Sequence, residues 1–247
     1  MNNRSITYTS DGSTSLSLEG TQECYHSAAG ALSESLHVYI KNGLEFFLDK
    51  AFERGDKIKK VTILEAGLGT ALNALLAFNL SRQYSNTEFY YLSIEKFPLS
   101  KEEYSKLNHP SVLIQKEECN LDKIEAIELF KQLHECEWGD WHKLGANFNF
   151  RKLEESFENL FPFADKIIDT AGSKIDVVFY DAFSFGLQPE LWSNEIFQGI
   201  SNAMNSNGIL VTYACRGVIK ENLRTAGLKV NRVAGFGDKH HMTRAIR

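Results

Sequence analysis

VTILEAGLGTALNALL, residues 61–76, combines the features that decide the fold: a buried strand, a glycine-rich turn and the start of a helix. The apolar residues Val61, Ile63 and Leu64 predict a strand covered on both faces. Gly67 and Gly69 allow a tight turn and a close backbone approach to a ligand. Thr70 is a suitable N-cap for the following helix, whose free amides and positive end would point at the same place. The stretch therefore predicts a site for a nucleotide-like ligand.

The turn alone is not specific, because the corner between a strand and a helix often contains glycine. The dinucleotide-binding pattern GxGxxG is also not met, since Ala71 follows Gly69 at the second position. A ligand-binding turn and a purely structural corner both remain open at this point.

The composition indicates a globular enzyme-sized chain. It has 247 residues, a 43% hydrophobic fraction and 4 prolines, which fit one large domain with a small attachment. We expect residues 1–55 to form an N-terminal ribbon and helix that cover a cofactor pocket, and residues 56–247 to form the main domain. The polar N-terminus and the lack of a membrane-length apolar run favour a cytoplasmic protein without membrane contact.

The four cysteines are widely spaced and form no CxxC pair, so we expect neither a disulfide framework nor a zinc site. Cys136 with His134 and His142 is the one cluster that suggests a metal, and chance proximity explains it more simply. We therefore expect no metal.

Charge is distributed unevenly along the chain. The net charge is −5, but residues 214–247 carry eight basic residues against Glu221 and Asp238, which gives +6 there and −11 elsewhere. Such a basic region fits contact with phosphates, and equally fits solvated faces of a helix and two strands. The eight are Arg216, Lys220, Arg224, Lys229, Arg232, Lys239, Arg244 and Arg247.

Hydrophobic periodicity predicts an α/β fold with a doubly wound, mostly parallel sheet and an antiparallel C-terminal edge. A hairpin turning at Asp11-Gly12 precedes it, and Ser27 is a plausible N-cap for the first helix, with Gly43 a possible break. Expected helices cover residues 27–52, 70–84, 98–107, 121–135, 155–161, 189–204 and 218–227; expected strands cover 61–66, 89–96, 112–116, 147–153, 174–183, 208–215, 228–236 and 240–247.

Two acidic residues close predicted parallel strands. Glu95 ends the second strand, where a carboxylate can accept both ribose hydroxyls of a bound nucleoside. Asp181 ends the strand of KIDVVFYDAF, which should lie beside the first strand if the sheet reverses its order there. Phe183 and Trp192 would then be aromatic walls of the shared crevice.

The sequence contains no GxxxxGK[ST], HExxH or GxSxG motif, which disfavours phosphoryl transfer, zinc proteolysis and serine hydrolysis. A crevice with one carboxylate and aromatic faces suits methyl transfer from a sulfonium donor, because the main tasks are alignment and removal of a proton. The alternative for Asp181 is a carboxylate that caps the next helix.

Several segments together resemble a methyltransferase family of the tRNA wobble-uridine pathway, known as MnmD or as the N-terminal half of the bifunctional MnmC. The resemblance covers nearly the whole chain, in order. It implies a class I S-adenosylmethionine-dependent fold and methylation of the amine of 5-aminomethyl(2-thio)uridine in tRNA. The segments are YHSAAGALSES (25–35), ILEAGLGTALN (63–73), SIEKFPL (93–99), YDAF (180–183), PELW (189–192), LVTYACRG (210–217) and GFGDKHHMTRA (235–245).

The resemblance also implies roles for individual residues, of which the most central is that Asp181 faces the substrate amine. S-adenosyl-L-methionine would be the cofactor, with no flavin or metal; tRNA would be the substrate, and a separate oxidase or upstream wobble enzymes would supply the aminomethyl group. Cofactor-binding residues would be Tyr25, Ser27, Glu34, Glu65, Gly67, Gly69, Thr70 and Glu95; substrate-binding residues would be Phe183, Trp192, Arg216, Lys239 and His240, with His241 nearby.

Three positions depart from the family pattern. Ala71 stands where the family often has glycine, and Phe185 replaces the usual proline after DAFS. Near residues 150–153 there is no acidic residue to contact the adenine amine.

Two alternatives remain open. A small-molecule amine methyltransferase or aminopropyltransferase of the same fold would need no basic face. A non-catalytic RNA- or nucleotide-binding module would use the crevice only to sense a ligand. The sequence leaves open the thiolation requirement, the tRNAs used and the oligomeric state.

Overall fold

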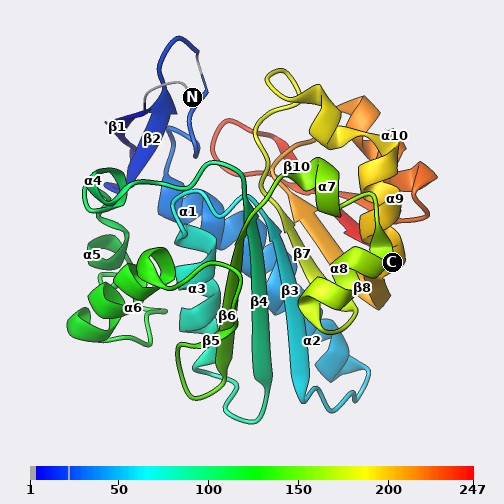
Figure 1. Cartoon of the computed structure of the whole chain (residues 1–247), viewed down its shortest axis with the longest axis horizontal. Coiled ribbons are helices and arrows are strands. Elements are labelled where there is room, and N and C mark those ends of the chain that lie inside the picture. The colour runs from blue at the N-terminus through cyan, green and yellow to red at the C-terminus, as the bar shows by residue number, and fades with distance from the viewer. Residues whose placement is uncertain (1–3, 22) are drawn as a thin grey trace.

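The computed structural model describes residues 4–21 and 23–247. An eight-stranded sheet runs through the molecule, and a separate two-stranded hairpin stands above one corner of it (Figure 1). The hairpin strands are β1 (Arg4–Tyr8) and β2 (Thr14–Leu18). In spatial order the large sheet contains β5 (His142–Lys143), β6 (Phe148–Glu154), β4 (Glu88–Glu95), β3 (Lys60–Ala66), β7 (Ile175–Tyr180), β8 (Met204–Thr212), β10 (His241–Ile246) and β9 (Lys229–Ala234).

The sheet reverses its strand order at β3, which pairs in parallel with both β4 and β7. β8 continues the parallel set, and β10 and β9 close the sheet as antiparallel strands. The predicted doubly wound fold with an antiparallel edge is therefore confirmed. The carboxyl ends of β3 and β7 are neighbours, as the crevice prediction requires.

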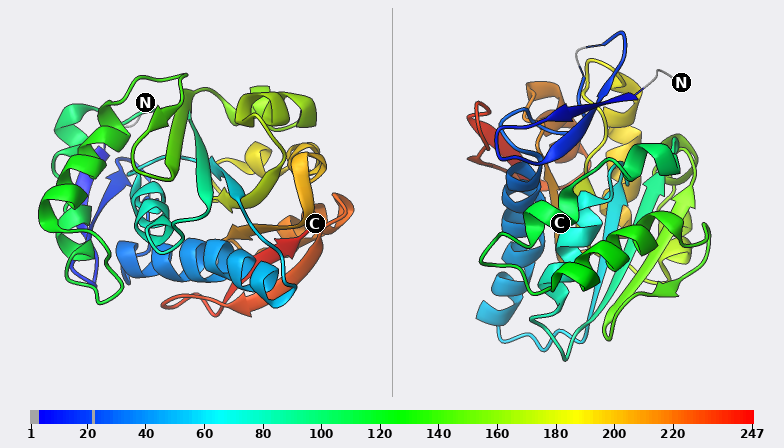
Figure 2. Two further views of the ribbon diagram at one scale, coloured as in Figure 1. Left: turned by 90° about the horizontal axis from the view of Figure 1, so that it is seen from below. Right: turned by 90° about the vertical axis from the view of Figure 1, so that its left-hand side faces the viewer.

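Helices cover both faces of the sheet, and alternate residues of β3 show why. Val61 and Ile63 join the core under the N-terminal helices, whereas Leu64 and Ala66 join the core under the later ones. Figure 2 shows the long N-terminal helix against one side of the sheet. The helices are α1 (Ala31–Ser35), η1 (Leu36–Glu45), α2 (Phe46–Glu53), α3 (Leu72–Ser81), α4 (Lys101–Tyr104), α5 (His109–Leu113), α6 (Lys123–Glu135), α7 (Phe157–Leu160), α8 (Ala164–Ala171), η2 (Pro189–Trp192), α9 (Asn194–Ala203) and α10 (Gly217–Thr225).

The N-terminal helix runs through α1, η1 and α2 without the break predicted at Gly43. Its central part, η1, is a π-helix, a wider form often found at functional sites. Gly43 instead allows close packing, because a Cβ there would lie 2.8 Å from a methyl of Val211 and 3.2 Å from the ring of Phe179. Gly43 therefore sets how closely this helix approaches β7 and β8.

The predicted hairpin is confirmed, and the tip of the hairpin also contacts the start of α1. The hydroxyl of Ser13 accepts the backbone amides of Ala31 and Leu32 at 3.1 and 3.2 Å, and Asp11 accepts the amide of Ser33 at 2.8 Å. These bonds satisfy amides of the first turn of α1, which would otherwise lack partners. The hairpin tip caps this helix in place of Ser27.

Three local predictions are wrong. Residues 112–116 do not form a strand, because Val112 and Leu113 belong to α5, and β6 occupies the place beside β4. Thr70 does not cap α3, whose N-cap is Ala71 in the left-handed conformation at φ +58°. Ser27 does not cap the first helix, which begins after Gly30. None of the described helices is long and apolar enough to cross a membrane.

Candidate active site

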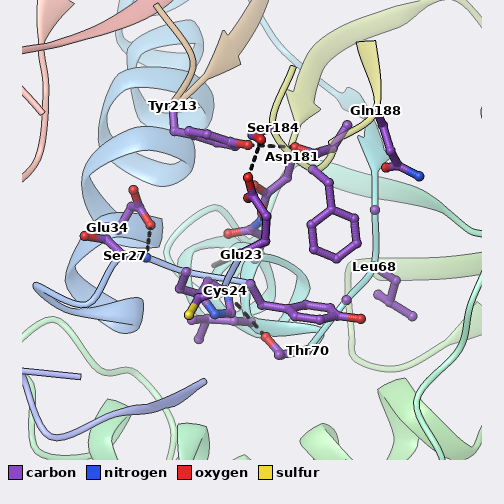
Figure 3. A pocket seen from close by; sticks show the side chains of 18 of the residues that line it. Glu23, Cys24, Ser27, Glu34, Leu68, Thr70, Asp181, Ser184, Gln188 and Tyr213 are labelled. Atoms are coloured by element: carbon purple, nitrogen blue, oxygen red, sulfur yellow. Dashed lines mark hydrogen bonds between the residues drawn. The ribbon is translucent and has the colours of Figure 1, made fainter. Parts of the chain in front are cut away.

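A cavity of about 520 Å³ opens at the carboxyl ends of β3, β4 and β7, and Figure 3 shows it from close by. Segments far apart in the chain form its walls: the loop before α1, the turn after β3, the end of β4, the loop after β7 and the turn before β10. Ten of the residues predicted from the sequence line it: Tyr25, Ser27, Glu34, Gly67, Gly69, Thr70, Glu95, Asp181, Phe183 and Lys239.

The turn after β3 touches the end of β7 directly. Gly67 has φ +95°, and a Cβ on it would lie 3.0 Å from the backbone oxygen of Asp181. The amide of Asp181 donates to the carbonyl of Ala66 at 3.0 Å. Glycine is therefore required at position 67 by both conformation and space.

Glu95 is fixed to the glycine turn by its carboxylate. One oxygen accepts the backbone amide of Gly69 at 2.9 Å, and the other accepts the amide of Phe97 at 2.7 Å. The side chain lines the cavity at the end of β4. It therefore presents oriented acceptor oxygens beside the turn.

Tyr25 covers the same turn from the opposite side. A Cβ on Gly69 would lie 3.1 Å from its ring, and its ring packs edge-to-face on Phe183 with the centres 5.1 Å apart. Behind the turn, the Thr70 hydroxyl lies 3.4 Å from the Nε2 atom of His26. The loop before α1 thus forms an aromatic cover over the cavity.

Asp181 is half-buried at the cavity wall, and both of its oxygens are held. The Tyr39 hydroxyl donates to one at 2.5 Å, and the Asn73 amide donates to the other at 2.9 Å. Burial raises the pKa of Asp181 to about 7, with the charge of Glu34 adding to this and the two hydrogen bonds opposing it. Asp181 can therefore exchange a proton near neutral pH from a fixed position.

Glu34 links the two ends of the chain inside the cavity. Its side chain accepts the amide of Ser27 at 2.7 Å and the ammonium of Lys239 at 2.7 Å. The Lys239 ammonium also lies 4.3 Å from the centre of the Tyr213 ring. A Cβ on Gly237 would lie 2.7 Å from the Cβ of Ala29, so this turn packs tightly on the loop before α1.

Two predicted binding residues are core residues instead, and both predictions are corrected here. Glu65 is fully buried beneath the turn and accepts the Ser93 hydroxyl at 2.6 Å. Burial raises its pKa to about 8, so it is mainly protonated at neutral pH. Trp192 is also fully buried, and its indole donates to the carbonyl of Phe183 at 2.9 Å. Trp192 supports the loop after β7 from behind and is not an aromatic wall of the cavity.

Arg216 and His240 are exposed and do not line the cavity. The Arg216 guanidinium lies 5.6 Å from the ring centre of Phe185, the residue that replaces the expected proline. Lys239, grouped with these two in the sequence-based prediction, points into the cavity toward Glu34 instead.

Sequence reasoning missed several residues that line the cavity or support it. Tyr39 holds Asp181 from behind the cavity wall, and its place among the apolar residues of the N-terminal helix gives no sign of this role. Asn73 lines the cavity, and a polar residue within an otherwise apolar helix is a signal that could have been used. Glu158 lies in the cavity wall beside Phe157, five residues or more beyond the segment searched for an acidic residue. Other missed lining residues include Glu23, Leu68, Ser184, Gln188 and Tyr213.

The described residues contain no group of three or more histidine, cysteine or acidic residues arranged to hold a metal ion. Cys24, Cys119, Cys136 and Cys215 are free.

Comparison with known proteins identifies relatives. Residues 128–247 match the sequence model of a family described as S-adenosyl-L-methionine-dependent methyltransferase. The chain is 26% identical over 233 residues to a Marinomonas protein named tRNA 5-methylaminomethyl-2-thiouridine biosynthesis bifunctional protein MnmC, covering 90% of this chain and 31% of the relative. It is 28% identical over 222 residues to the protein of that name from Nitrosospira multiformis, covering 89% and 33%. The chain thus spans about a third of the length of these relatives.

The fold is similar to a solved structure over its whole length. The crystal structure of MnmC2 from Aquifex aeolicus superposes with a TM-score of 0.73 at 26% identity, covering 99% of this chain and 70% of that one. Together with the strand order and the glycine turn, these matches show the fold of the S-adenosyl-L-methionine-dependent methyltransferases and a similarity to MnmC proteins over nearly the whole chain.

Proposed function

We propose that this protein transfers a methyl group from S-adenosyl-L-methionine to the primary amine of 5-aminomethyl(2-thio)uridine at the tRNA wobble position. The observation that carries the proposal is the placement of Asp181, which is fixed by Tyr39 and Asn73 at the wall of the cavity next to the glycine turn. The printed name of the curated relatives, which concerns 5-methylaminomethyl-2-thiouridine in tRNA, supports this choice of substrate.

Gly67, Gly69 and Glu95 form what we call the donor end of the cavity, and its residues fit the nucleoside donor. The glycines leave open space where side chains would project, and Glu95 can accept ribose hydroxyls. Phe157 and Glu158 continue this wall and are suited to the adenine. Tyr25, Ser27 and Thr70 would enclose the donor, which when bound supplies an electrophilic methyl group on sulfur.

Asp181, Glu34 and Tyr213 form what we call the acceptor end. This proposal moves Glu34 away from the cofactor, where the resemblance placed it, because its carboxylate holds Lys239. The substrate nitrogen must lose a proton before its lone pair can form the new N–C bond, while the electrons of the broken C–S bond stay on sulfur. Asp181 orients the amine and accepts its proton, since a carboxyl with a pKa of about 7 is ionised often enough to act as a base near neutral pH. Phe183 and Tyr25 exclude water from the site.

Arg216 and His240 are proposed to contact the RNA outside the cavity. Both are exposed, and Arg216 lies beside Phe185, so a cation and an aromatic ring are presented together. Lys239 would act inside the acceptor end through Glu34 rather than on the RNA backbone.

The aminomethyl group must be present on the uridine before this reaction. A separate oxidase or another upstream wobble-modification enzyme would provide the aminomethyl group, and tRNA modification of this kind would take place in the cytoplasm. We also propose that residues 1–55 serve as a cover for the donor cavity, separate in role from residues 56–247.

The test is single-turnover transfer of a labelled methyl group to tRNA that carries or lacks the aminomethyl group. Transfer only to the aminomethylated tRNA supports the proposal, and transfer to neither contradicts it. Transfer to free amines at a similar rate, unaffected by Arg216→Ala, would favour the small-molecule methyltransferase. Donor binding without any transfer would favour a non-catalytic binding module.

A further inference from the structure

Glu23 brings an additional carboxylate into the acceptor end. It lies in the loop before α1, and the Ser184 hydroxyl donates a short hydrogen bond to it. Ser184 follows Asp181 by three residues, and both line the cavity. Figure 3 shows the Glu23 and Ser184 side chains joined near Asp181.

Tyr213 shows that the charge of Glu23 reaches the same point as the other carboxylates. Its hydroxyl donates to the carbonyl of Ala182 at 3.0 Å. Burial raises the pKa of Tyr213, and the charges of Asp181, Glu23 and Glu34 raise it further, in that order. These three carboxylates therefore act on one small region of the cavity.

The two lysines that line the cavity are both paired with carboxylates other than Glu23, and Arg216 approaches the loop of Ser184 from outside the cavity. Lys239 is engaged by Glu34 at 2.7 Å, and Lys96 lies 3.9 Å from Glu158 at the opposite part of the wall. The Ser184 hydroxyl is a neutral partner, so this contact orients Glu23 without cancelling its charge. The acceptor end is therefore negative overall, and most so when Asp181 is ionised.

We propose that Glu23 determines specificity for the acceptor: together with Asp181 it admits a primary amine, neutral or as its ammonium, and rejects an amine that also bears a carboxylate. The inference rests on the proposed function and adds the substrate property that the site selects. The physical reason is repulsion between like charges in a partly enclosed cavity, where solvent screens them weakly. One such charge pair changes binding by about tenfold or more.

The test uses two anticodon stem–loop RNAs that differ only at the wobble uridine, one with a 5-aminomethyl group and one with the same group N-carboxymethylated. With native enzyme the first RNA is methylated and the second is at most a weak inhibitor. With Glu23→Gln, KM for the first RNA rises about threefold to tenfold while kcat falls less, and Ki for the second falls about tenfold.

Two matched variants separate charge from structure. Ser184→Ala removes the hydrogen bond but keeps the carboxylate, so it should still discriminate between the RNAs. Glu117→Gln removes an exposed carboxylate that does not line the cavity, and should leave the ratio of the two affinities as in the native enzyme. A Glu23→Gln enzyme that discriminates like the native one, or a Ser184→Ala enzyme that loses discrimination equally, would overturn the inference.

Binding of both RNAs is also measured in the presence of S-adenosylhomocysteine, without any transfer step. A native enzyme that prefers the aminomethyl RNA through Glu23 but transfers no methyl group would retain this inference and reject the proposed function. Methyl transfer combined with equal binding of both RNAs would support the proposed function and reject the inference about Glu23.

Discussion

The donor end and the acceptor end of the cavity are built differently. At the donor end, the backbone of one short segment sets the geometry. Gly67 and Gly69 make the turn, and the amide of Gly69 fixes Glu95. At the acceptor end, side chains from distant elements converge, with Tyr39 from η1 and Asn73 from α3 both holding Asp181. A local motif is sufficient for the first, whereas the second exists only in the folded chain.

The sharpest test of this difference is Asp181→Asn, which removes the proposed base but keeps the shape of the side chain. We expect kcat to fall by about 10²–10⁴-fold, the usual contribution of a general base. Donor affinity, measured by calorimetry, should change less than about threefold because the donor end is intact. Asp140→Asn, at an exposed position, is the control. Unchanged kcat would remove Asp181 from the mechanism.

Gly67→Ala should damage both ends, because this residue joins them. The new Cβ would meet the Asp181 carbonyl at 3.0 Å in a backbone conformation with φ +95°. We expect a loss of about 1–3 kcal/mol in the free energy of unfolding, measured with urea, together with weaker donor binding. Gly55→Ala is the matched control, since Gly55 has φ +79° but nothing within 4 Å of its Cβ. Equal donor binding in the two variants would contradict the importance of the contact.

Glu65→Gln should change the pH dependence of stability and leave donor binding nearly unaffected. Because burial raises the pKa of Glu65 from 4.5 to about 8, the native protein binds this proton more tightly than the unfolded chain does. The contribution of this proton to the free energy of unfolding is complete below pH 4.5. It falls by up to about 1.4 kcal/mol per pH unit as the pH rises to 8. Glutamine should remove this slope, as urea denaturation between pH 5 and 8.5 would show. A large loss of donor affinity would instead show that Glu65 contributes to donor binding.

Tyr39→Phe should change the pH dependence of the rate, because it removes a hydrogen bond to Asp181. The Tyr39 hydroxyl lowers the pKa of Asp181 against the larger effect of burial. Without it, the rising limb of the rate profile, expected near pH 7 in the native enzyme, should move to higher pH. We expect activity at pH 6 to fall about threefold to tenfold, with recovery at pH 9. A uniform loss at all pH values would indicate a purely structural role, and Tyr84→Phe serves as the control.

Ala71→Gly should have the smallest effect and improve stability. Ala71 is fully buried at φ +58°, a conformation that costs an alanine about 1–2 kcal/mol. Glycine removes this strain but gains freedom in the unfolded chain, so we expect a net increase of up to about 1 kcal/mol in the free energy of unfolding, by urea denaturation. A loss of stability would mean that the methyl group of Ala71 contributes more to packing than its strain costs.

The parts of the molecule that depend on local patterns could be predicted from the sequence. Nearly continuous apolar residues placed β3 and β7 correctly, and their carboxyl ends located Gly67 and Asp181 in one crevice. The predicted strand at 112–116 failed because a short apolar run suits a buried helix equally well, and Pro110 near its start favours α5.

The acceptor end could not be predicted to the same depth. Glu65 and Glu95 both lie near the ends of parallel strands, and Phe183 and Trp192 both follow β7, so the sequence does not tell which of each pair faces the cavity. Tyr39 meets Asp181 only because a π-helix packs closely on β7 through Gly43, which no periodicity reveals.

The contact between Glu34 and Lys239 has a consequence for synthesis on the ribosome. These two residues are 205 positions apart, so the acceptor end lacks its ion pair until nearly all of this sequence has emerged. The glycine turn, in contrast, is formed by residues within the first third of the sequence.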